Sequence, residues 1–366
     1  MLGPLDDLCA CGNSAQVGHF YTSYRNLCED VGVSLASEED KDKAFGPSSE
    51  GLILGIVYNT DEWTWYIRED KLARIIWAIK GLLDKMEAPL GEVWSVVGKI
   101  LHVKPLVEPG RHYVGELLRL FTCSKDKELI VILSNDFKRE LTWWLLFIQM
   151  CATRSRIPSA YRVPPPGTKV ADSDASGGTM LKLGNGVGVV IDEYRWTYLP
   201  WPKLFNSNAV SPCCGMKFRH KMSFLELIGH ALRIIAFPDT VCNSAVATLI
   251  DNDGSVKMSK KGYCVPCPVT DTLLRMIYEV TAALNGTEYV LEITRCSSRS
   301  SIAADAISKA SLDTLDKVMP LRNPDPEKIP VSFVKWLYTE GGPKADRDLG
   351  EKIIRELKGN GEDTLF

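Results

Sequence analysis

The chain has 366 residues, of which 45% are hydrophobic and 24% are charged, and its net charge is −3. This length allows two or three domains, and the composition excludes a chain that is disordered throughout. The small net charge excludes a global basic field, so a nucleic-acid partner would have to be held by local clusters of Lys and Arg.

Cysteine spacing and hydropathy indicate the cellular compartment of the protein. The 11 cysteines follow no regular framework, and Cys264 and Cys267 form one lone C-x-x-C pair. A structural zinc site usually needs two such pairs or an added pair of His, so we expect free thiols in a reducing compartment. There is no secretory signal pattern and no apolar run of about 18 residues. We therefore expect an intracellular protein, cytoplasmic or nuclear, that is not secreted and has no membrane partner; the oligomeric state stays open.

The first part of the chain mixes strand and helix patterns. The apolar run 52–58 and the following Trp63-Thr64-Trp65 predict a strand pair. Apolar side chains then recur at helical spacing in four segments, residues 69–85, 90–103, 113–121 and 136–150. The proline-rich stretch 163–167 is interpreted as a stiff linker and a domain boundary.

A different order of elements follows the linker. We expect five strands, at 168–176, 186–192, 194–199, 245–251 and 289–296. We expect three helices between and after them, at 223–237, 271–284 and 302–310. Three strands followed by alternating helices and strands predict a mixed five-stranded sheet with flanking helices. Residues 313–366 are expected to form a helical tail, with helices near 331–338 and 346–358.

Four acidic residues fall where the expected strands end or the expected helices begin. Asp174 and Asp251 end strands, and Glu226 and Asp305 lie in the first turn of helices. Side chains at such positions can converge on one crevice of an α/β sheet. Four clustered carboxylates could not all ionise without cations, and hard oxygen ligands suit Mg²⁺ or Mn²⁺. The pattern therefore predicts a site for two divalent ions, of the kind that hydrolyses phosphodiesters.

Each acid also has a structural interpretation. Ser223 and Glu226 fit a capping box before an apolar run. Asp251 could start a turn, Asp174 could cap a hairpin loop, and Asp305 could complement a helix N-terminus. The prediction of a metal site therefore depends on all four acids appearing in order on the right elements.

The register of two acids stays open. Asp172 lies two residues before Asp174, and Asp253 lies two residues after Asp251. Alternation along a strand puts each alternative on the same face as its partner, so the pattern does not choose between them.

Polar and basic residues near the third and fourth acids are candidates for phosphate contacts. For each group taken alone, a solvated surface is the slightly favoured explanation. The candidates for nucleic-acid binding are Asn252, Lys257, Lys260, Lys261, Arg295 and Arg299.

At these positions the chain resembles a known family. The four motifs are Asp174-Ala175-Ser176-Gly177, Phe224-Leu225-Glu226-Leu227, Ile250-Asp251-Asn252 and Ala304-Asp305-Ala306-Ile307-Ser308-Lys309. They look like those of the ribonuclease H domain of retroelement polyproteins, in particular the reverse transcriptase–ribonuclease H region of DIRS-type (tyrosine-recombinase) retrotransposons. The resemblance implies that the four acids bind two Mg²⁺ or Mn²⁺ ions and that the domain cuts the RNA strand of RNA–DNA hybrids without a small-molecule cofactor. Many relatives carry a His in the stretch matching Arg295 to Ser301, and its absence here implies slow turnover.

The first block resembles part of a polymerase. Asp6 and Asp7 lie in Leu5-Asp6-Asp7-Leu8, which looks like the Y-x-D-D hairpin of a reverse transcriptase palm, with Pro4 at the Tyr position. Residues 72–120 resemble the thumb and connection. The resemblance implies a region truncated at its N-terminus, because a third carboxylate and the fingers would precede Met1. Since the remaining pair cannot build the two-metal site, we expect this polymerase remnant to make no DNA.

These inferences combine into one expected organisation of class α+β and α/β. A partial palm at 1–66 and thumb or connection helices at 67–162 precede a ribonuclease H-like domain at 163–312 and a helical tail at 313–366. The expected function is metal-dependent hydrolysis of RNA in RNA–DNA hybrids. The alternative is a catalytically dead or co-opted retroelement fragment that only binds nucleic acid.

Overall fold

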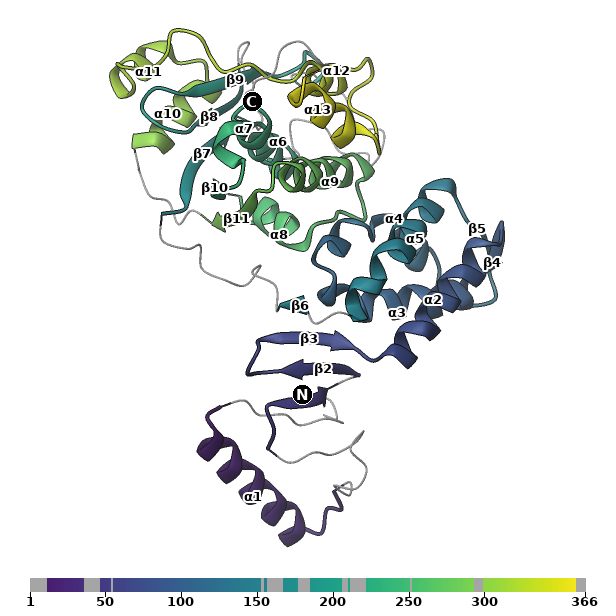
Figure 1. The fold of residues 1–366 in the computed structure, drawn as a ribbon. Coiled ribbons are helices and arrows are strands. Elements are labelled where there is room, and N and C mark those ends of the chain that lie inside the picture. Colours follow the sequence, from purple (N-terminus) through teal and green to yellow (C-terminus); the bar gives the residue numbers. More distant parts are fainter. Residues whose placement is uncertain are drawn as a thin grey trace. The chain divides into compact units, whose positions relative to one another are not determined.

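The computed structural model describes residues 12–35, 47–53, 55–152, 155–156, 167–176, 185–205, 210, 222–250, 252–292 and 299–359. The chain divides into two compact units (Figure 1). The first, called unit 1, consists of Met1–Gly110 and Ser124–Ser159, and the second, called unit 2, consists of Arg111–Cys123 and Ala160–Phe366. None of the described helices is long and apolar enough to cross a membrane.

Unit 1 combines a small sheet with helices. The sheet has the order β1-β2-β3-β6 within the described residues and is followed along the chain by a short ladder of β4 and β5. The elements are α1 (Ser14–Asp30), β1 (Glu50–Ile53), β2 (Ile56–Asn59), β3 (Thr64–Ile67), α2 (Glu69–Leu83), β4 (Glu87–Pro89), α3 (Leu90–Val103), η1 (Lys104–Leu106), η2 (Glu108–His112), β5 (Ile130–Ile132), α5 (Asn135–Phe147), η3 (Ile148–Ala152) and β6 (Ser155–Arg156). The helices α2, α3 and α5 confirm those expected from apolar spacing at 69–85, 90–103 and 136–150.

One expectation for unit 1 is wrong. The apolar run 52–58 is not a single strand but the two antiparallel strands β1 and β2, with Ile53 opposite Ile56. Gly55 sits at the reversal with a φ of 81°, a left-handed conformation that glycine adopts without strain. The hydropathy pattern does not show the break between β1 and β2, because the residues of both strands are apolar.

Buried apolar faces of α2, α3 and α5 form the helical core of unit 1. Trp144 of α5 is fully buried there. A Cβ added at Gly110 would lie 2.3 Å from the Trp144 ring, so the backbone of η2 approaches the indole more closely than a side chain would allow.

Unit 2 is a mixed α/β structure. Its described strands form the mixed five-stranded sheet expected from the order of elements, and the strand order is β11-β10-β7-β8-β9. The strands β7, β8 and β9 pair antiparallel, whereas β10 and β11 run parallel to β7. The elements are α4 (Gly115–Phe121), β7 (Lys169–Ala175), β8 (Gly186–Val190), β9 (Trp196–Pro200), α6 (Met222–Ile235), α7 (Pro238–Val241), β10 (Ala245–Ile250), α8 (Asp253–Lys261), α9 (Pro268–Ala283), β11 (Thr287–Glu292), α10 (Arg299–Ser308), α11 (Leu312–Val318), α12 (Val331–Leu337) and α13 (Leu349–Leu357).

Alternating residues of β8 separate two cores on the two faces of this sheet. Val187 and Val189 pack into a large cluster with α6 and α9. Val190 packs on the other face with α10 and α11 (Figure 1). The sheet therefore lies between two helical layers.

The C-terminal helices belong to the larger of these cores. Phe333 and Trp336 of α12 and Ile353 of α13 pack in the same cluster as α6 and α9. The residues expected as a tail therefore contribute to the fold of unit 2.

Two helix starts differ from expectation. Helix α6 begins at Met222, so Ser223 is not its N-cap, and Ser223 Oγ instead donates to Asn252 Oδ1 at 2.8 Å. The capping-box interpretation of Glu226 is therefore wrong. Helix α10 begins at Arg299, which places Asp305 in its middle rather than in its first turn. The interpretation of Asp305 as a helix N-terminus partner is also wrong.

A buried polar pair lies under α6. His230 Nε2 is in direct contact with Glu288 Oε1 of β11, and Ser259 Oγ lies 3.4 Å from His230 Nδ1. Burial lowers the pKa of His230 to about 3. Burial raises the pKa of Glu288 to about 8, against the pull of the Arg111 and Arg233 cations. Both shifts favour the neutral forms, so at neutral pH the pair holds one proton, on Glu288.

Substituting Gly110 with Ala should destabilise unit 1 by about 1–3 kcal/mol, because the new methyl group would overlap a fully buried Trp144. The matched control is Gly98→Ala in α3, where an added Cβ meets nothing within 4 Å. This variant should be as stable as the parent or about 0.5–1 kcal/mol more stable. Urea unfolding followed by circular dichroism compares them, and equal midpoints for Gly110→Ala and parent would contradict the packing described.

The lowered pKa of His230 and the raised pKa of Glu288 predict a specific pH dependence of stability. Unfolded His and Glu titrate near 6.5 and 4.5, so between these values the folded and unfolded pairs each hold one proton and stability is flat. Above 6.5 the unfolded chain releases its proton while the folded pair keeps it up to about pH 8. Stability should therefore fall by about 2 kcal/mol between pH 6.5 and 8. Urea unfolding of Glu288→Gln should lack this fall; an unchanged pH profile in that variant would refute the assignment.

Candidate functional site

The close packing of α10 on β8 positions two of the four predicted acids. Gly188 is the β8 partner of Asp174 in the antiparallel ladder. A Cβ at Gly188 would lie 2.7 Å from Ile307 Cβ and 2.8 Å from Ala304 O of α10. Only a residue without a side chain allows this approach. It places Asp305, next to Ala304, over the strand that carries Asp174.

Ser308 connects the Asp174 carboxylate to the backbone of α10 at Asp305. Ser308 Oγ donates to Asp174 Oδ2 at 2.5 Å and lies 3.0 Å from Asp305 O. Lys309 Nζ pairs with Asp305 Oδ1. Ser176 Oγ donates to Ser308 O at 2.8 Å and accepts from Gly186 N at 2.9 Å. The end of α10 is therefore fastened to both β7 and β8.

The joined acids are accessible to solvent. Asp174 is half-buried, and the side chains of Asp305 and Lys309 are 49% and 56% exposed. The hydrogen bond from Lys309 to Asp305, with the charges of Asp305 and Asp174, raises the pKa of Lys309 above its ordinary value. Lys309 thus carries a positive charge beside the acids.

The alternative first acid, Asp172, lies deeper. It shares the α10 face with Asp174, because it pairs with Val190 of the α10 core. Asp172 is 4% exposed and accepts a hydrogen bond from Ser301 Oγ at 3.1 Å. Since it lies closer to the protein interior, Asp172 is the less suitable residue to meet an incoming ligand.

Glu226 approaches β7 from the opposite helical layer. It is 2% exposed on α6. One turn further along α6, a Cβ at Gly229 would lie 3.0 Å from Ser173 Cβ, so α6 packs on the face of β7 opposite to Asp174. Glu226 is therefore held by the α6 core rather than by the Ser308 network.

The third acid, Asp251, lies outside the described residues. The next residue, Asn252, caps α8, and its Oδ1 accepts hydrogen bonds from Ser255 N at 2.9 Å and Ser223 Oγ at 2.8 Å. These bonds tie the starts of α8 and α6 together. The alternative acid Asp253 is exposed and forms an ion pair with Lys257 at 2.6 Å.

The basic residues expected to bind nucleic acid are only partly described. Lys257, Lys260 and Lys261 are exposed on α8, and Lys261 Nζ lies 4.4 Å from the centre of the Tyr263 ring. Arg295 lies outside the described residues, as does the side chain of Arg299, the first residue of α10. The polymerase-like pair Asp6 and Asp7 is also outside them.

The described acids supply the kind of oxygen donor that a divalent ion prefers, but too few of them lie together to hold one. Asp174 and Asp305 present hard oxygen donors from neighbouring elements. Within the residues that the structure describes, no group of three or more His, Cys, Asp or Glu side chains is arranged to hold a metal ion. A complete metal centre therefore requires a ligand from a residue beyond the described set, of which Asp251 is the predicted one.

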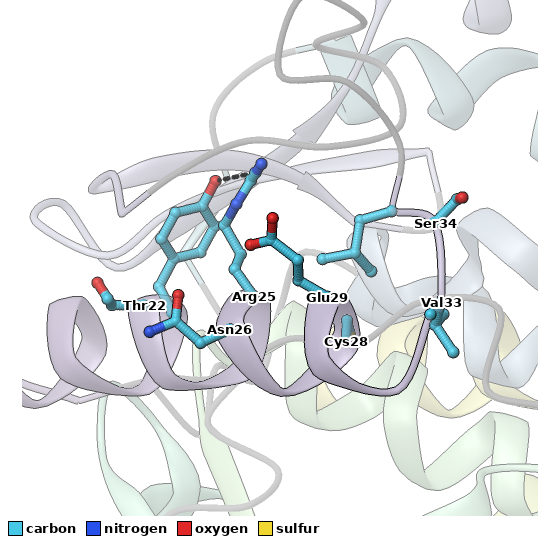
Figure 2. A pocket seen from close by; sticks show the side chains of 10 residues that line it. Thr22, Arg25, Asn26, Cys28, Glu29, Val33 and Ser34 are labelled. Atoms are coloured by element: carbon cyan, nitrogen blue, oxygen red, sulfur yellow. Dashed lines mark hydrogen bonds between the residues drawn. The ribbon is translucent and has the colours of Figure 1, made fainter.

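A hollow in unit 1 has a different character. It has a volume of about 620 Å³ and lies along the end of α1, where Arg25 and Glu29 share one side of the helix (Figure 2). Arg25 Nη1 donates to Tyr21 Oη at 3.0 Å. The lining includes one carboxylate, Glu29, among the described residues, so it does not supply the acid cluster that the sequence predicts.

Sequence reasoning did not single out Ser308 and Lys309 as site residues. Ser308, the last residue of α10, and Lys309, directly after it, follow Asp305 by three and four positions, a spacing that places side chains on the same face of a helix. From this spacing, the position of both side chains beside Asp305 could have been predicted.

Removing the hydroxyl of Ser308 tests the link between α10 and β7. Ser308→Ala should destabilise the protein by about 1.5–3 kcal/mol, because a buried hydrogen bond to a carboxylate is lost. The same substitution in an Asp174→Asn background should have a smaller effect, since the acceptor there is neutral. A double-mutant cycle by urea unfolding measures the difference, and additive effects would show that the two residues do not interact.

Comparison with known proteins gives little guidance. No protein-family model matches the chain, and no curated protein matches its sequence. One solved structure, the foamy viral protease-reverse transcriptase dRH in complex with ds DNA, is similar with 10% sequence identity and a TM-score of 0.26. The match covers 77% of this chain and 50% of that one, so the chain spans about half the length of the viral chain. A TM-score of this size is a weak structural similarity and does not establish a shared fold.

Proposed function

We propose that unit 2 is a metal-dependent nuclease of ribonuclease H type that hydrolyses the RNA strand of RNA–DNA hybrids. The observation that carries this proposal is the hydrogen bond from Ser308 of α10 to the Asp174 carboxylate of β7, which holds the part of α10 that carries Asp305 against β7. These residues are far apart in the sequence and were singled out there as two members of one acidic site.

The sheet of unit 2 supports the same proposal. Three antiparallel strands followed by two strands parallel to the first give the order β11-β10-β7-β8-β9. This is the mixed sheet that the four-motif resemblance implies. Helix α6 with Glu226 and helix α10 with Asp305 flank it, which matches the order of acids in the resemblance.

The proposed ligands are Asp174, Asp251 and Asp305. Glu226 stays a candidate from the sequence, since it lies in the α6 core on the face of β7 opposite to Asp174 and forms no metal-holding group with the other described acids. Two divalent ions bound there would supply an activated water and stabilise the leaving oxygen of the phosphodiester. Asp174 is preferred to Asp172 because it is more accessible. Asp251 is preferred to Asp253 because it directly follows strand β10, whereas Asp253 is an exposed residue in the first turn of α8.

The substrate would be held beside α8. Its exposed Lys257, Lys260 and Lys261 can each approach a phosphate, which fits binding by local basic clusters in a chain of net charge −3. Since Asn252 Oδ1 already accepts hydrogen bonds, a phosphate contact from this residue would come from its amide Nδ2. Arg295 and Arg299 stay candidates from the sequence, and we expect no DNA synthesis from the Asp6–Asp7 remnant.

Cleavage of a labelled RNA–DNA hybrid in Mg²⁺ or Mn²⁺ tests the proposal. The parent chain should release RNA fragments only when a divalent ion is present, and Asp174→Asn or Asp305→Asn should reduce the rate at least about 100-fold. The matched control is Asp313→Asn, which neutralises an exposed carboxylate in the first turn of α11 and should leave the rate unchanged.

Two results would overturn the proposal. One is cleavage by Asp174→Asn at the parental rate. The other is hybrid binding without any metal-dependent cleavage by the parent, which would support the alternative of a retroelement fragment that only binds nucleic acid.

A further inference from the structure

We propose that a basic hollow between α12 and α13 of unit 2 binds a backbone phosphate of the nucleic-acid substrate. The hollow has a volume of about 430 Å³ and is lined by α12, by the loop at 339–346 and by Lys352 of α13 (Figure 1). This inference rests on the proposed function, because it assigns the same substrate a second contact besides the lysines of α8.

Positive charge predominates in this hollow. Lysines line it from three places, Lys335 in the last turn of α12, Lys344 in the loop and Lys352 in α13. Asp346, the one carboxylate among the described lining residues, pairs with Lys352 at 2.7 Å and accepts a hydrogen bond from Asp348 N at 3.0 Å. Within the described part of the chain, Lys335 and Lys344 form no ion pair, so two ammonium groups remain for an anion.

Hydrogen bonds fix the loop that carries Lys344. The buried Trp336 donates from its indole Nε1 to Lys344 O at 2.8 Å. Further along the loop, Asp346 N donates to Thr272 Oγ1 of α9 at 3.1 Å. The loop is therefore held against both α12 and α9, and the hollow is formed before a ligand arrives. Such preorganisation lowers the entropy lost on binding.

The side chains of the lining suit a phosphate rather than a base. Lysine ammonium groups and serine hydroxyls are common donors to backbone phosphates, and Ser332 adds such a hydroxyl beside Lys335. A concave surface of one charge also concentrates the field that attracts an anion. Trp336 is buried and its indole N–H is already used, so it offers no free ring for a base to stack on. We therefore expect a contact that is independent of base sequence.

Polar contacts connect the hollow with the segment that follows α8. Arg347, directly after Asp346, has its Nη1 3.6 Å from Asp271 Oδ2. The other oxygen of this carboxylate accepts a hydrogen bond from Cys264 N at 3.0 Å, and Cys264 follows Lys261 of α8 by three positions. The lysines of the hollow and those of α8 thus belong to neighbouring segments of unit 2. This proximity is what a second contact with the same strand requires.

Binding of a labelled RNA–DNA hybrid to the full chain, measured by fluorescence anisotropy without divalent ions, tests this inference. The double variant Lys335→Gln, Lys344→Gln should bind roughly 5- to 50-fold more weakly than the parent at about 0.1 M salt. The slope of log Kd against log salt concentration should be smaller by about 1–2, because two phosphate contacts are lost. Replacing both lysines with Arg should preserve the parental affinity and slope, since the charge is kept.

The matched control is Lys358→Gln, which removes an exposed lysine at the end of α13 that does not line the hollow. It should leave affinity and slope unchanged. Urea unfolding of the double Gln variant should match that of the parent, because both substituted lysines are exposed.

The outcomes separate this inference from the proposed function. If the parent cleaves the hybrid but the double Gln variant binds it with parental affinity and slope, or if Lys358→Gln weakens binding equally, the phosphate contact is wrong and the nuclease stands. If calorimetry shows lysine-dependent binding of inorganic phosphate while hybrid affinity is unchanged, the hollow holds a free anion and its assignment to nucleic acid is wrong. If the double Gln variant loses affinity and slope but the parent cleaves no hybrid in Mg²⁺, the contact stands and the nuclease proposal falls. If the parent binds no hybrid, both fall.

Discussion

The approach of α10 to β8 at Gly188 is the constraint on which the candidate site depends. A side chain at this position would meet the Ile307 side chain and the Ala304 carbonyl, so the helix could not lie where it does. With the helix in place, Asp305 stands beside the strand of Asp174, and Ser308 reaches the Asp174 carboxylate. The absence of a side chain at Gly188 thus lets α10 lie close enough to the sheet to bring Asp305 near the strand that carries Asp174.

Unit 2 neutralises its polar groups in two different ways. Beneath α6, burial shifts the pKa values of His230 and Glu288 towards their neutral forms. At the end of α10, where solvent has access, the Asp305 carboxylate forms an ion pair with Lys309. The first arrangement stabilises the core, whereas the second leaves carboxylates that a cation from solution can reach. Only the second has the properties of a ligand site.

Much of the fold follows from sequence patterns, because long apolar periodicities identify helices such as α2 and α9, and the order of elements identifies the mixed sheet. Two kinds of feature did not follow. The reversal at Gly55 lies within a continuous apolar run, so the pattern hides it. The packing of α12 and α13 against α9 depends on contacts between distant segments, which local spacing does not encode. For the site, strand and helix positions predicted Asp174 and Asp305 together, but the hydrogen bonds of Ser308 and Lys309 needed coordinates.

The most direct test of the account is the location of a bound ion. Crystals of the chain equilibrated with Mn²⁺ and measured at the manganese absorption edge would show the metal by its anomalous signal. The account predicts an anomalous peak within coordination distance of both Asp174 and Asp305. A peak elsewhere in unit 2, or none at a saturating Mn²⁺ concentration, would contradict it.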